Sequence, residues 1–320
     1  MTDSGQNANV LELPWYIDSP PIRRWVSRLE SEDNRAEAER RVAAWIKMVD
    51  DHDVIKIDIK GRIGLVELAY PLKANALVPP MYKLFVDAID KLAENDDVWV
   101  IVIRGQGNNF SSGGFVGPDA FYAGLDSGED GTRAEPVRRT STELFQGVPR
   151  AINRCEKPII AMVNGPVMAE AVDIALAADL RTGHVGTEFR FSFATTGNTA
   201  YTGASWSLPH LIGLSRAKQA LLTSEWIKGE RAYEIGLLNF LYDTESLEAE
   251  TLALAEKITG LPPVTQRLLK KELALGLDIG NYNGAMETYG MIETIVQTTE
   301  DHMDAERAVV EKRAPIVRGY

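Results

Sequence analysis

The stretch Gly105-Gln-Gly-Asn-Asn-Phe-Ser-Ser-Gly-Gly114 directly follows a continuous apolar run, Val98-Trp-Val-Ile-Val-Ile103. An apolar run of this length, bounded by polar and glycine residues, predicts a buried β-strand. Glycine tolerates positive φ and lets a ligand approach the backbone closely. We therefore predict that the turn Phe110-Ser-Ser-Gly-Gly114 offers backbone N–H groups that stabilise negative charge on an oxygen atom.

A second segment further along the chain also combines a predicted buried strand with a glycine-containing turn. In Lys157-Pro-Ile-Ile-Ala-Met-Val-Asn-Gly165 a predicted buried strand ends in Asn-Gly, and a helix is expected from about Ala169 to Ala177. The first N–H groups of a helix lack intrahelical partners and lie at its positive dipole end. Two strand ends that face each other in this way would form an oxyanion hole.

The rest of the chain alternates strands with helices. Residues 54–68 alternate around Gly61 and predict a β-hairpin, and helices are expected over 81–93 and 143–153. Strand–helix–strand units imply right-handed crossovers and an α/β fold. After about residue 246 the pattern is helical only, with helices expected over 247–258, 263–275, 282–296 and 300–312.

Two segments flank or interrupt this pattern. Residues 1–20 are predicted to form an arm, followed by an amphipathic helix over Ile22–Asp50 that lies on the core or on a neighbouring subunit, or else serves as a substrate lid. The segment Asp119–Thr140 is rich in Gly, Asp and Glu and is predicted to be a long loop after the key turn. Long loops inside compact domains are typically functional or disordered.

Composition excludes several classes of protein. The 320 residues carry a net charge of −12, which argues against binding to nucleic acid or to an anionic membrane. Cys155 is the single cysteine, so no internal disulfide framework exists. There is no apolar run of 18 residues and no apolar signal-peptide core, so we expect a cytoplasmic protein. The histidines lack metal-ligand spacing, and we expect neither a metal site nor a permanently bound cofactor.

Several short segments, taken in order, resemble motifs of the crotonase (enoyl-CoA hydratase/isomerase) superfamily from about Val54 to the C-terminus. Tyr70-Pro-Leu-Lys-Ala-Asn-Ala-Leu77 resembles RPxxxNAL, Phe110–Gly114 resembles FSAGxD, and Lys157–Gly165 resembles KPxIAAVNG. The remaining matches are Asp179 after the following helix, Gly203-Ala-Ser-Trp-Ser-Leu-Pro-His-Leu-Ile-Gly213, and Glu311-Lys-Arg313.

The resemblance implies an α/β fold, a crotonase-like spiral of ββα units with a C-terminal helical region. It also implies a homotrimer or a homohexamer built from two trimers. We accordingly expect an N-terminal arm and helix over residues 1–50, a crotonase core over 51–245, and a C-terminal helical trimerisation region over 246–320.

The resemblance also assigns catalytic roles. The N–H of Ser112 would be the first oxyanion donor, and the N–H of Glu170 the second, at a position where the family usually has glycine. Asp173 matches the first of the two carboxylates that hydratases use, whereas Phe193 stands where the second would be. A standard two-glutamate hydration is therefore not expected, and Asp173 or Glu170 would move the proton.

Further residues are expected to line the substrate site. These are Lys73, Ala74, Phe110, Gly113, Gly114, Phe193, Tyr201, Trp206 and His210, with Lys73, Lys312 and Arg313 as candidate partners for coenzyme A phosphates. Phe115 departs from the family pattern, which usually has Asp there.

Three functions remain open from the sequence. The first is an acyl-CoA enzyme of isomerase, hydratase or lyase type, with coenzyme A as part of the substrate. The second is a CoA-independent C–C hydrolase of a cyclic β-diketone, similar to the 6-oxocamphor hydrolase branch through Asn164-Gly-Pro-Val167 and the Pro209-His210 pair. The third is a non-catalytic homologue.

Overall fold

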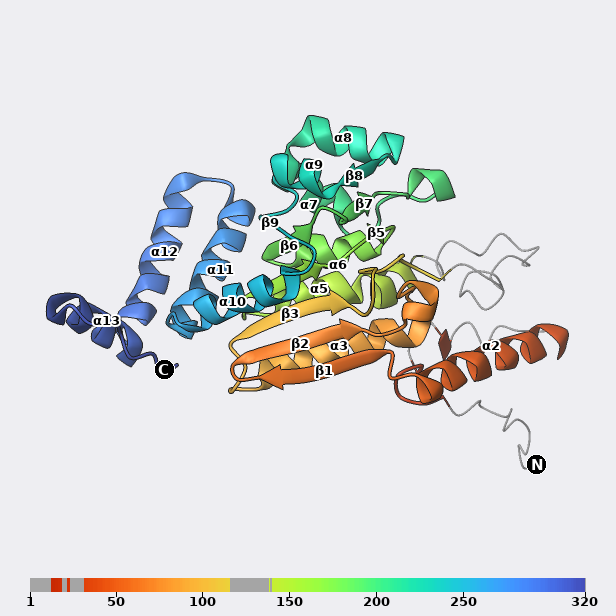
Figure 1. The fold of residues 1–320 in the computed structure, drawn as a ribbon, viewed down its shortest axis with the longest axis horizontal. Helices are drawn as coiled ribbons and strands as arrows, with labels where there is room; N and C mark the ends of the chain where they lie inside the picture. The colour runs from red at the N-terminus through yellow and green to blue at the C-terminus, as the bar shows by residue number, and fades with distance from the viewer. Residues whose placement is uncertain (1–12, 19–21, 24–31, 116–137, 139, 320) are drawn as a thin grey trace, which may run out of the picture.

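A β-hairpin that continues into a parallel sheet forms the centre of the molecule (Figure 1). The structure, a computed structural model, describes residues 13–18, 22–23, 32–115, 138 and 140–319. Within these residues the main sheet has six strands in the order β1-β2-β3-β4-β6-β9. They are β1 (Ile55–Lys60), β2 (Ile63–Leu68), β3 (Val100–Gly105), β4 (Ile159–Val163), β6 (Leu180–His184) and β9 (Phe240–Tyr242). Only the β1–β2 pair is antiparallel, which confirms the hairpin and the predicted crossovers.

Helices cover both faces of this sheet because its central strands are apolar on both sides. On β3, Ile101 and Ile103 pack into the large core with α3 (Pro79–Glu94) and α5 (Gly147–Arg154). The alternate residues Val100 and Val102 pack against α10 (Leu247–Thr259). The continuous apolar run that predicted this strand is thus explained by its double burial.

A smaller layer lies beside the main sheet. The strands β5 (Val167–Met168), β7 (Glu188–Arg190) and β8 (Trp226–Lys228) form a second sheet. The neighbouring helical elements are α6 (Ala171–Ala177), η4 (Ala194–Thr196), α7 (Ala204–Ile212), α8 (Leu214–Thr223) and α9 (Gly229–Glu234). Because β5 directly precedes α6, this layer holds the start of α6 against the Gly-rich turn.

The helices at both ends of the described chain extend away from the sheet (Figure 1). At one end of the molecule lies α2 (Glu32–Asp51), and at the other lie α11 (Pro263–Ile279), α12 (Tyr282–Gln297) and α13 (Glu300–Glu311). The four predicted C-terminal helices are confirmed within a few residues. No helix in the described ranges is both long and apolar enough to cross a membrane.

Two of the predicted helices have different bounds in the structure. The helix expected over 143–153 is divided at Gln146 into a π-helical turn, η3 (Ser141–Phe145), and α5. Of the expected helix 22–50, Ile22 and Arg23 are helical and α2 begins at Glu32, whereas 24–31 lie outside the described residues. The loop prediction for 119–140 lies almost wholly outside them too, and the boundaries at 50 and 245 stay predictions.

Two motif residues prove to be structural anchors. The buried Lys157 donates from Nζ to the carbonyl oxygens of Leu92 (2.8 Å) and Asn95 (2.6 Å), at the end of α3. Asp179 accepts from the N–H of Ile159 (2.7 Å) and from Nζ of Lys270 (2.8 Å). The start of β4 is therefore fixed relative to α3 and, through Lys270, to α11.

Candidate active site

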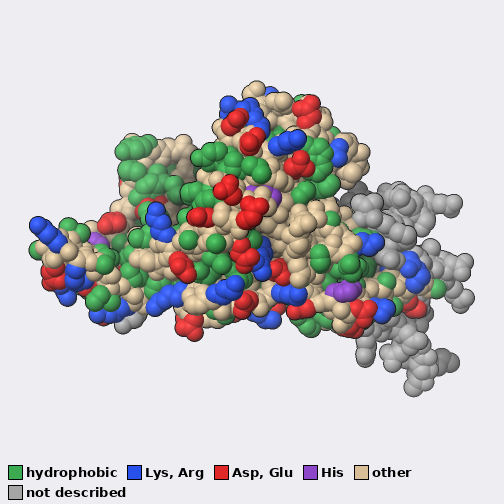
Figure 2. Space-filling model, in the orientation of Figure 1, with side chains coloured by type: hydrophobic (Ala, Val, Ile, Leu, Met, Phe, Trp, Pro, Cys, Tyr) green, Lys and Arg blue, Asp and Glu red, His purple; other side chains and the backbone are tan. Residues whose placement is uncertain are grey.

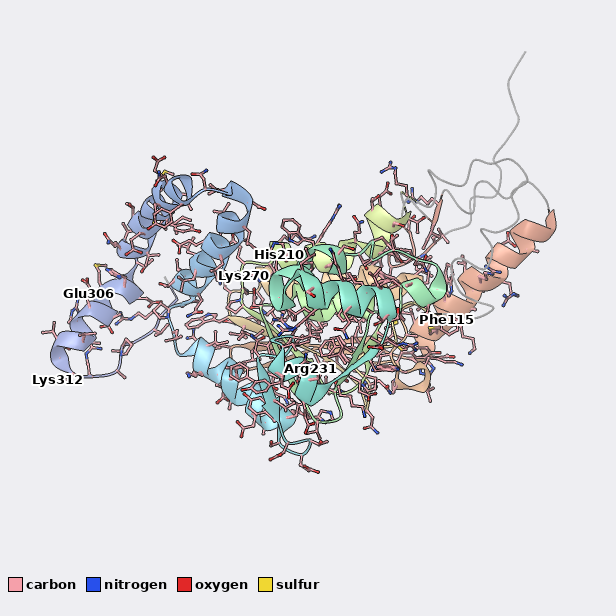
Figure 3. All side chains as sticks on the ribbon, turned by 90° about the horizontal axis from the view of Figure 1, so that it is seen from above. Phe115, His210, Arg231, Lys270, Glu306 and Lys312 are labelled. Atoms are coloured by element: carbon pink, nitrogen blue, oxygen red, sulfur yellow. The ribbon has the colours of Figure 1, made fainter. Side chains whose placement is uncertain are left out.

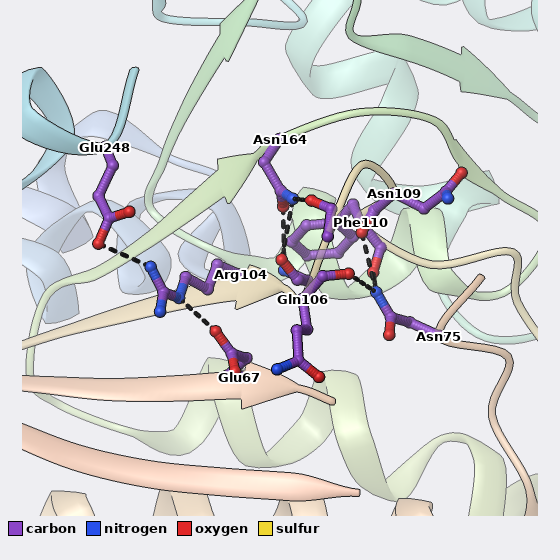
Figure 4. Close-up of polar contacts among 10 residues, drawn as sticks. Glu67, Asn75, Arg104, Gln106, Asn109, Phe110, Asn164 and Glu248 are labelled. Atoms are coloured by element: carbon purple, nitrogen blue, oxygen red, sulfur yellow. Dashed lines mark hydrogen bonds and ion pairs between the residues drawn. The ribbon is translucent and has the colours of Figure 1, made fainter. Parts of the chain in front are cut away.

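The Gly-rich loop after β3 is held in shape by the side chain of Asn75 (Figure 4). Its Nδ2 donates to the carbonyl oxygens of Gln106 (3.0 Å), Asn109 (2.9 Å) and Phe110 (3.2 Å). Its Oδ1 accepts from the N–H of Tyr70 (2.9 Å). Asn75 has φ +54, a left-handed conformation that asparagine tolerates better than most residues. The asparagine of the Tyr70–Leu77 motif is thus a scaffold for the loop.

Asn164 holds the same loop from the other side (Figure 4). Its Oδ1 accepts from the N–H of Gly105 (3.0 Å), and its Nδ2 donates to the carbonyl oxygens of Gly105 and Gly107 (both 2.8 Å). Beneath the loop, Arg104 pairs with Glu67 of β2 and with Glu248 of α10, both at 2.7 Å (Figure 4). Two asparagines and one ion-pair network therefore fix where the turn begins.

The turn itself is bridged to two other segments. Ser111 pairs with Val167 of β5, and Gly114 pairs with Leu77. The Phe110 side chain is fully buried in the core, so only its backbone lies at the turn. Ser111 Oγ donates to the Asn75 carbonyl oxygen (2.7 Å). The turn is consequently a rigid platform for the backbone groups of residues 112–114.

The N–H of Ser112 already has a partner. It donates to the carbonyl oxygen of Ala74 at 2.9 Å, and Ala74 is itself in a left-handed conformation, with φ +50. Ala74 and the exposed Lys73, two of the predicted substrate-site residues, thus lie beside the turn, and their role in binding stays a prediction. To hold a substrate oxygen, the Ser112 N–H must share or release this hydrogen bond.

Gly113 and Gly114 lie directly against the segment before α6. A Cβ atom on Gly113, whose φ is +82, would lie 2.6 Å from Cβ of Ala169 and 3.4 Å from N of Glu170. A Cβ on Gly114 would overlap the Glu170 carboxyl group, lying 3.1 Å from its Cδ. The two strand ends therefore meet, and the glycines permit the contact.

Glu170 lies at the N-cap of α6 with its carboxyl group turned inward. Among the described residues its N–H donates to no other backbone group, but it faces the carboxyl group of Glu170 itself and lowers the pKa of that group. Its carboxyl oxygens accept from the hydroxyls of Tyr82 and Tyr201. Burial raises the pKa of Glu170, and the two tyrosine hydrogen bonds oppose that rise.

Asp173 lies one helical turn further along α6, on the same face as Glu170. Its side chain is buried, and its Oδ2 accepts from the hydroxyl of Thr202. Its Oδ1 has no hydrogen-bond partner among the described residues. Burial raises the pKa of Asp173 to about 7, and the nearby Glu170 adds to the rise. Two buried carboxyl groups with raised pKa values beside a backbone donor are suited to proton transfer.

An aromatic cluster completes the site. Tyr82 of α3, Phe145 of η3 and Tyr201 surround the Glu170 carboxyl, and Phe145 contacts both tyrosine rings. Sequence analysis missed Tyr82 and Phe145. Their helical spacing marks them as buried, but nothing in a helical pattern shows that the Tyr82 hydroxyl reaches a carboxyl group 88 positions away.

Other predicted site residues lie elsewhere. Phe193 is buried in the core and supplies no carboxyl group, as expected. Trp206 is 61% exposed on α7, with its ring 4.6 Å from that of His210. Figure 3 separates His210 from Phe115 along the long axis of the molecule. The structure thus does not bring His210 to the turn.

The basic residues near the C-terminus are also remote within this chain. Lys312 lies at the far end of the C-terminal helices, opposite to Phe115 (Figure 3). Arg313 is paired with Asp304 (2.7 Å) and Glu311 (2.6 Å). In the described ranges, no three His, Cys, Asp or Glu side chains are grouped as metal ligands.

Comparison with known proteins identifies the family of the chain. A family model described as enoyl-CoA hydratase/isomerase matches residues 58–318. A protein of Mycobacterium bovis named as a probable enoyl-CoA hydratase is 30% identical over 259 residues, which cover 80% of this chain and 90% of that protein. The peroxisomal Delta(3,5)-Delta(2,4)-dienoyl-CoA isomerase of Arabidopsis thaliana is 26% identical over 247 residues, covering 77% and 88% of the two chains.

A solved structure supports the fold. The crystal structure of enoyl-CoA hydratase from Bacillus anthracis matches with a TM-score of 0.76, covering 83% of this chain and 100% of that one. Its sequence identity of 23% makes this a similarity of fold.

Proposed function

Because the chain belongs to the enoyl-CoA hydratase/isomerase family and has its crotonase-like α/β fold, we propose that it stabilises the enolate of an acyl-CoA thioester. The reaction would be of isomerase, hydratase or lyase type. Coenzyme A would enter as part of the substrate, with no permanently bound cofactor, and we propose a cytoplasmic location.

One observation carries this proposal: the Glu170 carboxyl group adjoins Gly114 of the turn, and Asp173, one helical turn further along α6, supplies a second, buried carboxyl group. The N–H groups of Glu170 and Ser112 would hold the thioester oxygen as negative charge develops on it. Glu170 and Asp173 would move the proton between substrate carbons. The Lys73 ammonium, exposed beside the turn, would contact a coenzyme A phosphate.

The absence of an acid at Phe193 favours isomerisation over hydration. Isomerisation needs a proton carried from one carbon to another, which one carboxylate can do, whereas standard hydration uses two carboxylates around a water molecule. The relatives include both a probable hydratase and a dienoyl-CoA isomerase, so the preference rests on position 193.

The test is turnover of a panel of thioesters. We expect the purified protein to convert at least one 2-enoyl-, 3-enoyl- or dienoyl-CoA, with loss of activity in Glu170→Gln and Asp173→Asn. Failure to bind any acyl-CoA in calorimetry would overturn the proposal. The protein should then be incubated with bicyclic β-diketones, because a C–C hydrolase is the alternative function. A protein that converts neither acyl-CoA thioesters nor β-diketones would be a non-catalytic homologue. In this chain His210, from one of the two features that favoured the hydrolase, lies apart from Phe115 (Figure 3).

We also propose that the chain assembles as a homotrimer or homohexamer through its C-terminal helices. Leu269, Leu273 and Leu277 recur every four residues on α11 and are all exposed. Figure 2 shows hydrophobic side chains on the surface of this region. Exposed apolar faces of this kind are typical of interfaces, and a second copy of the chain is the occupant that the family resemblance implies.

A further inference from the structure

The Glu170 carboxyl group lies between two tyrosine hydroxyls that come from separate parts of the fold. Tyr82, on α3, donates to Oε1. Tyr201, which follows η4, donates to Oε2 at 3.3 Å. Each carboxyl oxygen therefore has its own hydroxyl donor, and the side-chain torsions, including the one that sets the plane of the carboxyl group, are restrained.

The two tyrosine rings are themselves fixed by Phe145. Its ring centroid lies 4.8 Å from that of Tyr82 and 6.1 Å from that of Tyr201, with interplanar angles of 61° and 64°. Such edge-to-face contacts are favourable and directional. The next residue, Gln146, donates from Nε2 to the Tyr201 carbonyl oxygen at 2.7 Å. The η3–α5 junction thus holds the side chains of both tyrosines and the backbone of Tyr201.

The restrained carboxyl group faces the turn on which the substrate would rest. Its Cδ lies 3.1 Å from the position of a Cβ atom on Gly114, so it fills the space above that glycine. A glutamate free to rotate at the N-cap of a helix would gain hydration by turning outward. The two hydroxyls compensate the carboxyl group for the water that it loses here.

We propose that Tyr82 and Tyr201 are positioning residues that aim the Glu170 carboxylate at the reacting carbon of a substrate held on the Gly113–Gly114 turn. The inference rests on the proposed function for its substrate. In the step, the carboxylate takes a proton from carbon, and the C–H electron pair stays on the substrate as the enolate. The same proton then returns to another carbon, so nothing is oxidised or reduced.

The arrangement in which Tyr82 and Tyr201 hold the Glu170 carboxyl group, here called the clamp, has an electrostatic consequence that can be measured. The titratable groups facing Glu170 in the described structure are Tyr82, Tyr201 and, on its own helix, Asp173. The tyrosine hydrogen bonds lower the pKa of Glu170 against the effect of burial. Loss of either hydroxyl should therefore raise that pKa by about one unit, the usual scale for a hydrogen bond to a charged group.

The experiment compares Tyr82→Phe and Tyr201→Phe with wild type and with Tyr289→Phe as the matched control. Tyr289 also donates a hydroxyl hydrogen bond, to the Glu272 carbonyl oxygen at 3.0 Å, but on the remote helix α12. The Glu170 carboxyl band is identified by infrared difference against Glu170→Gln and titrated with pH. Where the wild type turns over an acyl-CoA, kcat/KM is measured over the same pH range.

We expect the Glu170 titration midpoint and the acidic limb of kcat/KM to move about one pH unit upward in both site variants and not in Tyr289→Phe. An unchanged midpoint in a folded Tyr82→Phe or Tyr201→Phe would overturn the clamp. The two variants lie on different elements, so one that fails to fold leaves the other as the test. A shifted midpoint without any acyl-CoA turnover would instead overturn the proposed function and keep the clamp.

Discussion

The carboxyl group of Glu170 occupies the space that a side chain at position 114 would need. Its Cδ lies 3.1 Å from where a Cβ atom on Gly114 would be, and one carboxyl oxygen lies closer still. The glutamate at the start of α6 and the glycine at the end of the turn are therefore a matched pair. A larger residue at 114 is compatible with this fold only if the carboxyl group points elsewhere.

The first prediction follows from this pair. In Gly114→Ala the new methyl group displaces the Glu170 carboxyl from between Tyr82 and Tyr201. The backbone at Gly114 does not have positive φ, and the displaced atoms are the end of a flexible side chain, so the fold should persist. We expect unfolding temperature to change little and kcat/KM to fall at least about tenfold, as misplaced catalytic groups typically cause.

The control for this variant is Gly290→Ala. A Cβ atom on Gly290, in α12, meets no atom within 4 Å. This variant should keep wild-type kcat/KM. Full activity in Gly114→Ala would mean that Glu170 is not needed where the structure places it.

Comparison of sequence with structure shows what a linear pattern can reveal. The strands β3 and β4 were predictable because burial on both faces leaves continuous apolar runs, and the turns after them because glycine marks special backbone geometry. Asp173 and Glu170 could be located because they follow a motif at fixed spacing. These are all local signals.

The contacts of Glu170 could not be predicted in the same way. Tyr82 is one more apolar-face residue of a helix, and its hydroxyl partner is set by how α3 packs against α5, which in turn packs against α6. The hydrogen bond from Ser112 N–H to the Ala74 carbonyl was missed for the same reason. Tertiary packing decides such pairs, and neither periodicity nor motif spacing encodes it.

The second prediction concerns the pH dependence of stability. The pKa of Asp173 is raised from 3.8 to about 7, so the folded state holds its proton more tightly than the unfolded state. Stability from this group is complete below the unfolded pKa and is lost as pH rises through about 7. A shift of three units corresponds to about 4 kcal/mol, and Asp173→Asn, which cannot ionise, avoids that loss.

We therefore expect Asp173→Asn to unfold at a temperature higher than wild type by roughly 5–10 °C near pH 8, with little difference near pH 4. Its kcat should fall about a hundredfold or more, since acid–base groups contribute on that scale. Thermal melts at both pH values check the predicted change in unfolding temperature, and an activity assay checks the predicted change in kcat. Equal melting temperatures near pH 8 would show that folding does not raise the pKa of Asp173.

The third prediction concerns the scaffold of the turn. Asn75→Ala removes three hydrogen bonds to carbonyl oxygens and one from the Tyr70 N–H. Because these groups stay buried and lose their partner, we expect a loss of roughly 3–5 kcal/mol in the free energy of unfolding, measured with urea. Asn198→Ala, which removes one exposed hydrogen bond to Thr196, should cost less than about 0.5 kcal/mol.

The fourth prediction tests self-association. Leu273 on α11 is 75% exposed and contributes to the apolar stripe with Leu269 and Leu277. A charge in the middle of an apolar interface is not tolerated, so Leu273→Glu should shift the mass seen by light scattering from a trimer or hexamer toward the monomer. The matched control is Leu72→Glu, because Leu72 is equally exposed but lies in the short helical turn η1 (Pro71–Lys73), outside the C-terminal helices. A wild-type protein that is already monomeric at micromolar concentration would contradict the proposed assembly.

The last prediction separates the backbone of the turn from its side chains. Among the described residues the hydroxyl of Ser112 makes only a long contact of 3.4 Å with the Lys73 carbonyl oxygen, whereas its N–H donates to the Ala74 carbonyl oxygen at 2.9 Å. Ser112→Ala keeps the N–H and should change kcat/KM by less than about threefold, as expected for loss of a weak, exposed contact. If the hydroxyl were a proton donor to the substrate, the same variant would lose activity about a hundredfold or more. A small effect would therefore assign the role of residue 112 to its main chain, and a large one would move Ser112 into the proton-transfer machinery beside Glu170.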